Sequence, residues 1–336
     1  MTSAVERGSR LAWRPTLCAV GLLAAVGLPF LVSSYWVRVL TTVLLSAVLA
    51  SALNLIAGYA GYPAFGNVVF FGLGAYAAAI AMARWGLPFG AGAALGVGVS
   101  TAFALVVGWP LLRLRGHYFA IATLGMNEAM RALVENLSAL TGGGMGLSTP
   151  SVTGDVVFIN RYFYFLLLSL LVAVLGTTAW VAASRFGYGT RSIRFDEAAA
   201  SSCGVPTTRY KLTAWALSAI FTSLAGSAYA YWFAYIEPSV VFDMTISVKM
   251  FVMMLLGGMA TVFGPVLGAL VIELVAHVAW SQLLVYHSAV FALVIVGVTL
   301  LLPAGLLNVS LPRAPSVVAL GLFDWRAPWR RWIGRS

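Results

Sequence analysis

Charged residues are scarce in this sequence, at 9% of 336 positions, whereas about a quarter of an ordinary soluble domain is charged. Apolar runs recur along nearly the whole chain, each long enough for the roughly 17 to 25 residues that a spanning helix needs. The runs are continuously apolar instead of alternating, which favours helices over the strands of a barrel. The sequence therefore excludes a soluble globular protein and predicts an all-α integral membrane protein, a polytopic helical bundle.

Residues that carry enzyme chemistry are also few. Two cysteines, Cys18 and Cys203, lie in different surroundings, so neither a disulfide nor a zinc site is expected. No GxxxxGK[ST] phosphate-binding loop occurs, and no His, Asp or Glu cluster has catalytic spacing. We therefore expect no catalytic residue, no metal site and no cofactor bound by this chain. The net charge of +10 lies at the ends and between spans, which indicates contact with membrane lipids and not with nucleic acid.

About ten spans are predicted, some of them broken or re-entrant. Their approximate bounds are 16–34, 38–57, 66–83, 89–112, 117–139, 162–183, 211–235, 245–262, 264–284 and 288–303. With the N-terminus inside, most basic residues fall on the inner side, as the positive-inside rule requires. The chain then divides into a basic cytoplasmic N-terminus (1–15), a transmembrane domain (16–310) and a basic, tryptophan-rich cytoplasmic tail (311–336).

The longest polar interruption runs from Arg185 to Lys211, within a predicted cytoplasmic loop at 184–210. It contains five basic residues and only two acids, Asp196 and Glu197. Acids suit the N-terminal end of a helix, alanine favours helix, and glycine followed by proline ends it. The stretch from Asp196 to Gly204 is therefore predicted to be a short exposed helix, which suits it as a binding site for another protein.

Two stretches contain residues that break helices at membrane depth. The first is GYAGYPAFGNVVFFGLGAY, from Gly58 to Tyr76, and the second surrounds Gly257 and Gly258. Such backbone is tolerated where it lines a cavity or is covered by protein. Two interpretations of the first stretch stay open: a broken helix beside a transport pathway, or small residues that allow close helix packing.

Ionisable residues within the spans are the other unusual feature. Glu128 and Arg131 are spaced i, i+3, so they either neutralise each other or contact a substrate. Lys249 is expected to extend toward the membrane surface, and Glu273 requires a partner or contact with water. The glycines of TGGGMGL, from Thr141 to Leu147, predict a flexible outer connector, or bare amides at the mouth of a pathway.

Several motifs in the same order resemble one known family over roughly residues 38–310. They are GYAGYPAFGNVVFFGLGAY, RLRGHYFAIATL, TGGGMGL, DEAAASSCGV leading into RYKLTAWALSAIFTSLAG, and LLGGMATVFGPVLGAL followed by LLPAGLL. In these motifs the chain resembles the permease subunits of high-affinity, Liv-type ABC importers for branched-chain amino acids. The resemblance implies a bacterial inner-membrane, multi-pass importer subunit that works by alternating access. It also implies a coupling helix that docks on an ATPase, formed by Asp196, Glu197, Ala198, Ala199, Ala200 and Gly204.

The same resemblance implies a set of partners. They are a related second permease in a heterodimer, two cytoplasmic ATPase subunits that use ATP and Mg²⁺, and an extracytoplasmic solute-binding protein. The binding protein would deliver substrate to the outer mouth, near Thr141, Gly142, Gly143 and Gly144. The expected substrate pathway comprises Gly61, Tyr62, Phe65, Asn67, Asn127, Glu128, Gly257 and Gly258.

The chain departs from the family in two places. Residues 62–67 read YPAFGN where the family usually carries a Gln-Leu-Ser-Leu-Gly-His-like run, and Ala304 stands where a basic residue is common. The first departure lies beside the expected pathway, so the alternative substrates are urea or short amides, which relatives also carry. A transporter driven by an ion gradient is a further alternative, because Glu128, Arg131, Lys249 and Glu273 are ionisable.

Overall fold

The computed structural model describes residues 21–282, except 22 and 153, together with residue 306. The predicted last span, both terminal segments, Cys18 and Ala304 lie outside the described residues. Within them, residues 23–31 are helical and precede the long helices. The first half then contains α2 (Ser34–Leu53), a π-helical turn η1 (Asn54–Gly58), a 3₁₀ turn η2 (Phe65–Asn67), α3 (Val68–Trp85), α4 (Phe89–Leu111) and α5 (Gly116–Asn136).

A compact connection and the remaining helices follow. The connection comprises α6 (Ser138–Thr141), the 3₁₀ turn η3 (Gly143–Met145) and strand β1 (Leu147–Ser148). The second half contains α7 (Val156–Ala183), α8 (Arg185–Phe195), α9 (Glu197–Ser202), α10 (Thr207–Phe233), β2 (Tyr235–Ile236), α11 (Pro238–Val241), α12 (Met244–Gly257) and α13 (Gly264–Gln282). Strands β1 and β2 pair antiparallel, with Leu147 opposite Ile236.

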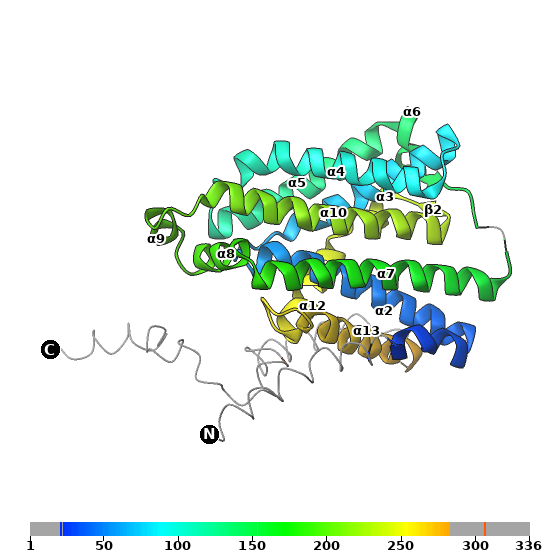
Figure 1. The fold of residues 1–336 in the computed structure, drawn as a ribbon. Helices are drawn as coiled ribbons and strands as arrows, with labels where there is room; N and C mark the ends of the chain where they lie inside the picture. The colour runs from blue at the N-terminus through cyan, green and yellow to red at the C-terminus, as the bar shows by residue number, and fades with distance from the viewer. Residues whose placement is uncertain (1–20, 22, 153, 283–305, 307–336) are drawn as a thin grey trace, which may run out of the picture.

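The long helices run side by side as a bundle (Figure 1). Helices α8 and α9 lie at one end, and α6 and β2 lie at the opposite end. Five helices in the described part of the chain are long and apolar enough to cross a membrane. The predicted class, a polytopic helical membrane protein with broken segments, is confirmed.

Helix bounds differ from the predicted spans mainly where glycine intervenes. The span predicted at 245–262 ends early, because α12 stops at Gly257 and a turn separates it from α13. In the loop at 184–210 the sequence indicated one short helix, but the structure has two, since α8 precedes α9. Ser184 explains the start of α8: its hydroxyl accepts a hydrogen bond from the Gly187 amide at 3.2 Å.

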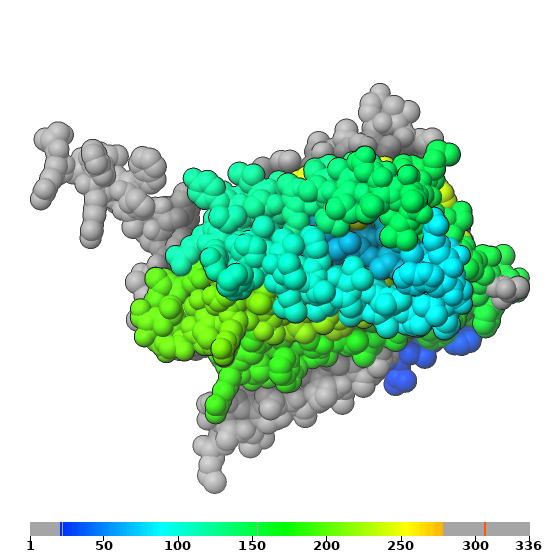
Figure 2. Space-filling model, turned by 90° about the horizontal axis from the view of Figure 1, so that it is seen from above, coloured from blue at the N-terminus to red at the C-terminus, as the bar shows by residue number. Residues whose placement is uncertain are grey.

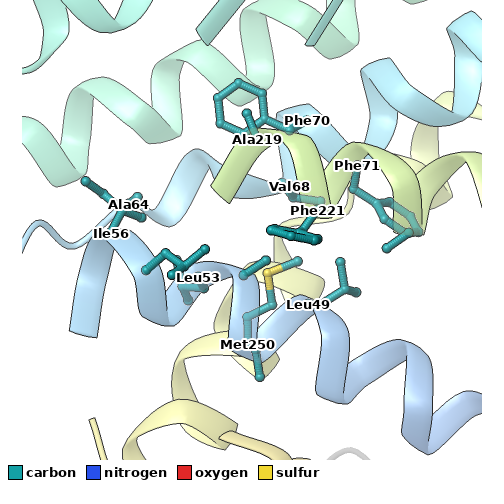
Figure 3. Packing of buried hydrophobic residues seen from close by; sticks show 14 of the residues in the cluster. Leu49, Leu53, Ile56, Ala64, Val68, Phe70, Phe71, Ala219, Phe221 and Met250 are labelled. Atoms are coloured by element: carbon teal, nitrogen blue, oxygen red, sulfur yellow. The ribbon is translucent and has the colours of Figure 1, made fainter. Parts of the chain in front are cut away.

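The core of the bundle forms where α2, α3, α10 and α12 meet. Figure 3 shows apolar side chains from all four helices gathered together, with Val68 beside Phe221, Met250 close to Phe221, and Leu49 and Leu53 of α2 on either side. Helices α4 and α5, in cyan and blue-green, make up much of the face seen in Figure 2. The π-helical turn η1 lies within this packed interior, because all five of its residues are buried.

Small residues set the distance between α3 and α10. A Cβ atom on Gly226 would overlap the carbonyl oxygen of Phe71, and one on Gly74 would overlap that of Ser223. The Ser227 hydroxyl lies 3.0 Å from the Gly74 carbonyl oxygen. Because lipid offers no hydrophobic drive for helix association, such close backbone approach is a main source of helix–helix attraction. For Gly74, which belongs to the first breaker-rich stretch, the close-packing interpretation is confirmed.

Replacing Gly226 by valine should separate α3 from α10, since the added atoms overlap backbone that cannot move alone. We expect a destabilisation of about 2 kcal/mol, measured by unfolding in mixed detergent micelles. Gly98→Val in α4 is the matched control, because nothing lies within 4 Å of a Cβ atom there. Equal stability of the two variants would contradict this account of the α3–α10 contact.

Candidate functional site

The segment between α7 and α10 contains the predicted coupling helix. Asp196 caps α9: its Oδ1 accepts hydrogen bonds from the amides of Ala198 at 2.8 Å and Ala199 at 3.1 Å. Gly204, with a φ of +83°, ends the turn in a conformation that favours glycine. The helix predicted from Asp196 to Gly204 is present, and residues 184–206 are called the α8–α9 segment below.

The predicted coupling residues do not all face the same way. Asp196, Ala198, Ala199 and Gly204 are exposed. Ala200 is buried, and the Glu197 side chain is only 14% exposed. Asp196, Ala198 and Ala199 therefore lie on the exposed side of α9, while Glu197 and Ala200 face the rest of the protein.

Glu197 lies at the centre of a compact polar cluster. Its Oε1 accepts a hydrogen bond from the Lys211 ammonium at 2.7 Å, and its Oε2 accepts one from the Tyr62 hydroxyl at 2.7 Å. The Arg115 Nε atom lies 3.3 Å from Oε2. These four residues, called the Glu197 cluster, belong to three separate parts of the chain besides α9.

Lys211 is the most buried member, with a side chain only 4% exposed. Besides Glu197, its ammonium donates to the Leu112 carbonyl oxygen at 2.7 Å and to the Tyr62 hydroxyl at 2.9 Å. An ammonium has three donors, so all of them are used. A buried charge of this kind is tolerated only when it is paired and fully hydrogen-bonded.

Electrostatics keeps Glu197 ionised. Burial opposes its charge, but the hydrogen bonds from Lys211 and Tyr62, and the charges of Lys211 and Arg115, outweigh burial and lower its pKa. The pKa of Tyr62 is raised, first by burial and then by the neighbouring carboxylate. The carboxylate is thus charged and the phenol neutral at physiological pH, which is the pairing that the hydrogen bonds require.

Two arginines of α8 contact the same breaker-rich stretch as Glu197. Arg194 donates a hydrogen bond to the Gly58 carbonyl oxygen at 2.6 Å. The Arg191 guanidinium lies 5.2 Å from the centre of the Tyr59 ring. Together with the Tyr62–Glu197 hydrogen bond, they attach the α8–α9 segment to residues 58–62 at three points.

Those residues are part of a break that meets the second break in the bundle. Asn54, which is fully buried, donates from Nδ2 to the Thr261 carbonyl oxygen at 2.8 Å. Its Oδ1 accepts from the Ala260 amide at 2.9 Å. One side chain therefore joins η1 to the turn between α12 and α13, and satisfies backbone groups that those helices leave unpaired.

The predicted pathway residues fall into separate places. Gly61 lies against Arg194, and Tyr62 belongs to the Glu197 cluster. Phe65 stacks on Phe251 at a centroid distance of 4.3 Å. Gly257 is buried where α12 ends, so close to Gly264 that a Cβ atom would overlap its carbonyl oxygen, and Gly258 caps that helix with a φ of +120°.

The remaining pathway residues are polar and lie on α5 and at the start of α3. Asn67 is fully buried between Thr222 and Ser218, at 3.0 Å from each hydroxyl. Asn127 is buried and donates to the Phe242 carbonyl oxygen at 2.9 Å. Glu128 is exposed.

Arg131 of α5 forms an ion pair that the sequence analysis did not consider. Its Nε atom lies 3.0 Å from Oε1 of Glu135, one helical turn further along α5. The suggested neutralisation of Arg131 by Glu128 is therefore replaced by an i, i+4 pair. This geometry suits oppositely charged side chains on one helix face.

The glycine-rich connector is more ordered than a flexible linker. Thr141 is buried, and its hydroxyl donates to the Val134 carbonyl oxygen at 2.7 Å. Gly142 and Gly143 adopt positive φ angles, and Gly143 is buried, whereas Gly144 is exposed. The predicted flexible connector is thus a fixed turn that leads into β1, at the end of the bundle opposite α9.

Five residues of this site were not singled out from the sequence: Asn54, Arg115, Arg191, Arg194 and Lys211. The four basic residues were counted only as cytoplasmic charges, and no local signal distinguished Lys211 from the other basic residues at span ends. In the part of the chain that the structure describes, no group of three His, Cys, Asp or Glu side chains is arranged to hold a metal ion. The contacts of this site bind one segment of the chain to another.

Comparison with known proteins gives a consistent result. Residues 35–302 match the family described as "Branched-chain amino acid transport system / permease component". The chain is 31% identical, over 318 residues, to the high-affinity branched-chain amino acid transport system permease protein LivM of Salmonella typhimurium, covering 87% of this chain and 74% of that protein. With LivM of Escherichia coli it shares 31% identity over 277 residues, covering 75% of this chain and 65% of that protein, just under two thirds. No solved structure matches.

Removing the Glu197 carboxylate should leave the Lys211 ammonium buried without its counter-charge. We expect Glu197→Ala to destabilise the protein by about 3 kcal/mol, and the double variant Glu197→Ala/Lys211→Met to be less destabilised than the sum of the two single variants. Unfolding in mixed detergent micelles measures both. Arg115→Ala is the control and should cost less than about 1 kcal/mol, since its side chain is 67% exposed. Strict additivity would contradict direct coupling between Glu197 and Lys211.

Proposed function

The chain belongs to the permease component family of branched-chain amino acid transport systems, and we propose that it is a transmembrane subunit of an ATP-driven importer. Its cargo in this proposal is a branched-chain or other hydrophobic amino acid. The observation that carries the proposal is the three-point attachment of the α8–α9 segment to residues 58–62. A protein that receives mechanical work at its surface needs such a rigid connection to its interior.

The source of energy is assigned from a motif that the sequence lacks. The sequence has no phosphate-binding loop, so ATP hydrolysis is assigned to separate ATPase subunits. Those subunits would dock on the exposed face of α9, at the end of the bundle assigned to the cytoplasm by the positive-inside rule. ATP-driven movement of the ATPases would displace the α8–α9 segment, and alternating access follows from the coupled movement of the attached helices.

Further partners are assigned to the remaining surfaces. A related second permease completes the membrane-spanning unit. An extracytoplasmic binding protein would deliver substrate to the end of the bundle formed by the Thr141–Met145 turn and the β1–β2 pair. The ordered backbone of that turn supports this role, because a fixed surface costs less entropy to bind than a flexible one.

Reconstitution into liposomes separates the ATP-driven importer from a transporter driven by an ion gradient. We expect leucine uptake only when the chain is reconstituted with its second permease, both ATPases and the binding protein, with ATP on the ATPase side. Uptake by the chain alone under a proton or sodium gradient would contradict the proposal. If urea or acetamide competes for uptake and leucine does not, the cargo belongs to the short-amide class.

Phe195 offers a sharper test of docking at α9. It is 82% exposed and directly precedes the cap of α9, in the position of an apolar anchor for a partner. We expect Phe195→Ala to weaken binding of the ATPase subunits about tenfold and to reduce substrate-stimulated ATP hydrolysis, measured on the reconstituted complex. The control is Phe158→Ala, which truncates a residue 57% exposed at the start of α7, outside the α8–α9 segment and the Thr141–Met145 turn. Wild-type ATPase binding by the Phe195 variant would exclude this contact.

A further inference from the structure

Helix α5 has an exposed side that does not suit contact with lipid. In Figure 2 this helix forms part of the molecular surface, in blue-green. It is 21 residues long, yet it is not among the described helices that are apolar enough to cross a membrane. By contrast, α4 contains no ionisable residue, and the exposed residues of α7 are all uncharged. The exposed sides of α4 and α7 therefore suit lipid, whereas that of α5 does not.

Glu128 is the residue of this side that lipid disfavours most. It lies twelve residues after Gly116, where α5 begins, and eight residues before Asn136, where α5 ends. At 1.5 Å of rise per residue, it lies about 12 Å inside the end of the helix at Asn136. Its side chain is exposed in the isolated chain. An ionisable group at such depth in a membrane faces a protein partner or water and not the acyl chains.

The charges around Glu128 add up to a negative surface. Arg131 is one turn further along α5, but its Nε atom is paired with Oε1 of Glu135 at 3.0 Å. Three acids, Glu128, Glu135 and Asp243, act electrostatically on this one arginine. All three acids are exposed or partly exposed. A partner that covers this side of α5 therefore has to supply positive charge.

The same side of α5 allows a second helix to approach closely. Gly125, Ala129 and Ala132 are exposed there, and nothing lies within 4 Å of a Cβ atom placed on Gly125. Small residues at this spacing let the backbones of two membrane helices come into contact. The exposed side of α4 also contains small residues, Ala94 and Gly98. The charge at Glu128 is thus what distinguishes α5 from a side that lipid can cover.

A second copy of this chain does not fit the charge. In a symmetric dimer the same patch of both copies meets itself. Glu128 and the acids near it would then lie against their own counterparts, and like charges brought together at an interface are destabilising. The partner that the charge favours is a different membrane protein, with a basic side chain on the helix that faces α5.

We propose that the exposed side of α5 is the contact surface for the second permease, whose facing helix presents a lysine or arginine to Glu128. This inference rests on the proposed function, in which a related permease completes the membrane-spanning unit. The ion pair removes both charges from contact with lipid, and Gly125 and Ala129 let the two helices approach. A charge pair between the subunits also favours the heterodimer over two copies of either chain.

Site-specific photo-crosslinking tests the surface in the assembled complex, which is prepared in lipid nanodiscs with the second permease, both ATPases and the binding protein. Benzoylphenylalanine replaces Ile121, which is 65% exposed on the same side of α5 as Glu128. Irradiation should attach it to the second permease, as identified by mass spectrometry. The matched control replaces Val106, which is 73% exposed on α4, and should give lipid adducts only. Adducts from position 121 to a second copy of this chain, to the binding protein or to lipid alone would overturn the proposal.

Charge reversal tests the ion pair separately. Glu128→Arg should reduce the amount of second permease that co-purifies with the tagged chain by about tenfold. Reversal of the basic residue that the crosslinked peptide identifies, to glutamate, should restore co-purification with Glu128→Arg. Asp155→Arg is the control, because Asp155 is an exposed acid that precedes α7 and lies outside this surface. Wild-type co-purification by the Glu128 variant would exclude the ion pair.

Failure of this surface can be distinguished from failure of the proposed importer. If uptake requires ATP and the second permease co-purifies, but the probe at position 121 does not reach it, the surface is wrong and the importer stands. If the probe reaches the second permease in a complex whose uptake is independent of ATP, the surface is supported and the importer is rejected.

Discussion

The carboxylate of Glu197 is the contact on which the geometry of the α9 end of the bundle depends. It receives the buried ammonium of Lys211 from α10 and the hydroxyl of Tyr62 from the connection between η1 and η2. Taking this carboxylate away would expose the buried ammonium to the full cost of desolvation. The cluster therefore fixes α9 with respect to two other parts of the bundle, and α9 cannot shift without carrying them or breaking the ion pair. A short helix of six residues would otherwise be too small to hold a position by itself.

A displacement of the α9 end affects the interior only if it is transmitted there, and two breaks in the helices provide the connection. Arg194 holds the Gly58 carbonyl oxygen at the end of η1, and Asn54 at the start of η1 holds the turn between α12 and α13. Hydrogen bonds of this kind satisfy backbone groups that an unbroken helix would pair internally, which lowers the energetic cost of the breaks. The α8–α9 segment, η1 and the α12–α13 turn are thus connected in series through named side chains.

The sequence predicted the helical class, most span positions, the two breaks and the helix at Asp196 to Gly204, because each depends on local signals: apolar length, glycine and proline, and a capping acid. It could not predict which surfaces those elements share. Lys211 looks like one more basic residue of a cytoplasmic loop until the fold brings Glu197 and Leu112 to it. Asn54 carries no local signal, since its partners are more than 200 positions away. Arg131 illustrates the same limit within a single helix: two acids are in reach, and only the rotamers decide that Glu135 is the partner.

The position of η1 also links the α9 end of the bundle to the cavities between α2, α12 and α13. Helix α2 continues directly into η1, and Ser46 precedes Asn54 by eight residues, or about 12 Å of helix. Ser46 orients Glu273, and Thr42 lines both cavities one turn further along α2. In the proposed importer, a displacement of the α8–α9 segment acts on η1 through Arg194 and Tyr62, and reaches α2 and the α12–α13 turn together. Helix α2 carries Thr42 and Ser46, and the turn joins α12, which carries Lys249, to α13, which carries Glu273. A shift of α2 against α13 would move Ser46 relative to the carboxylate that it orients, so a displacement of α9 is expected to change the shape of the cavities between α2, α12 and α13.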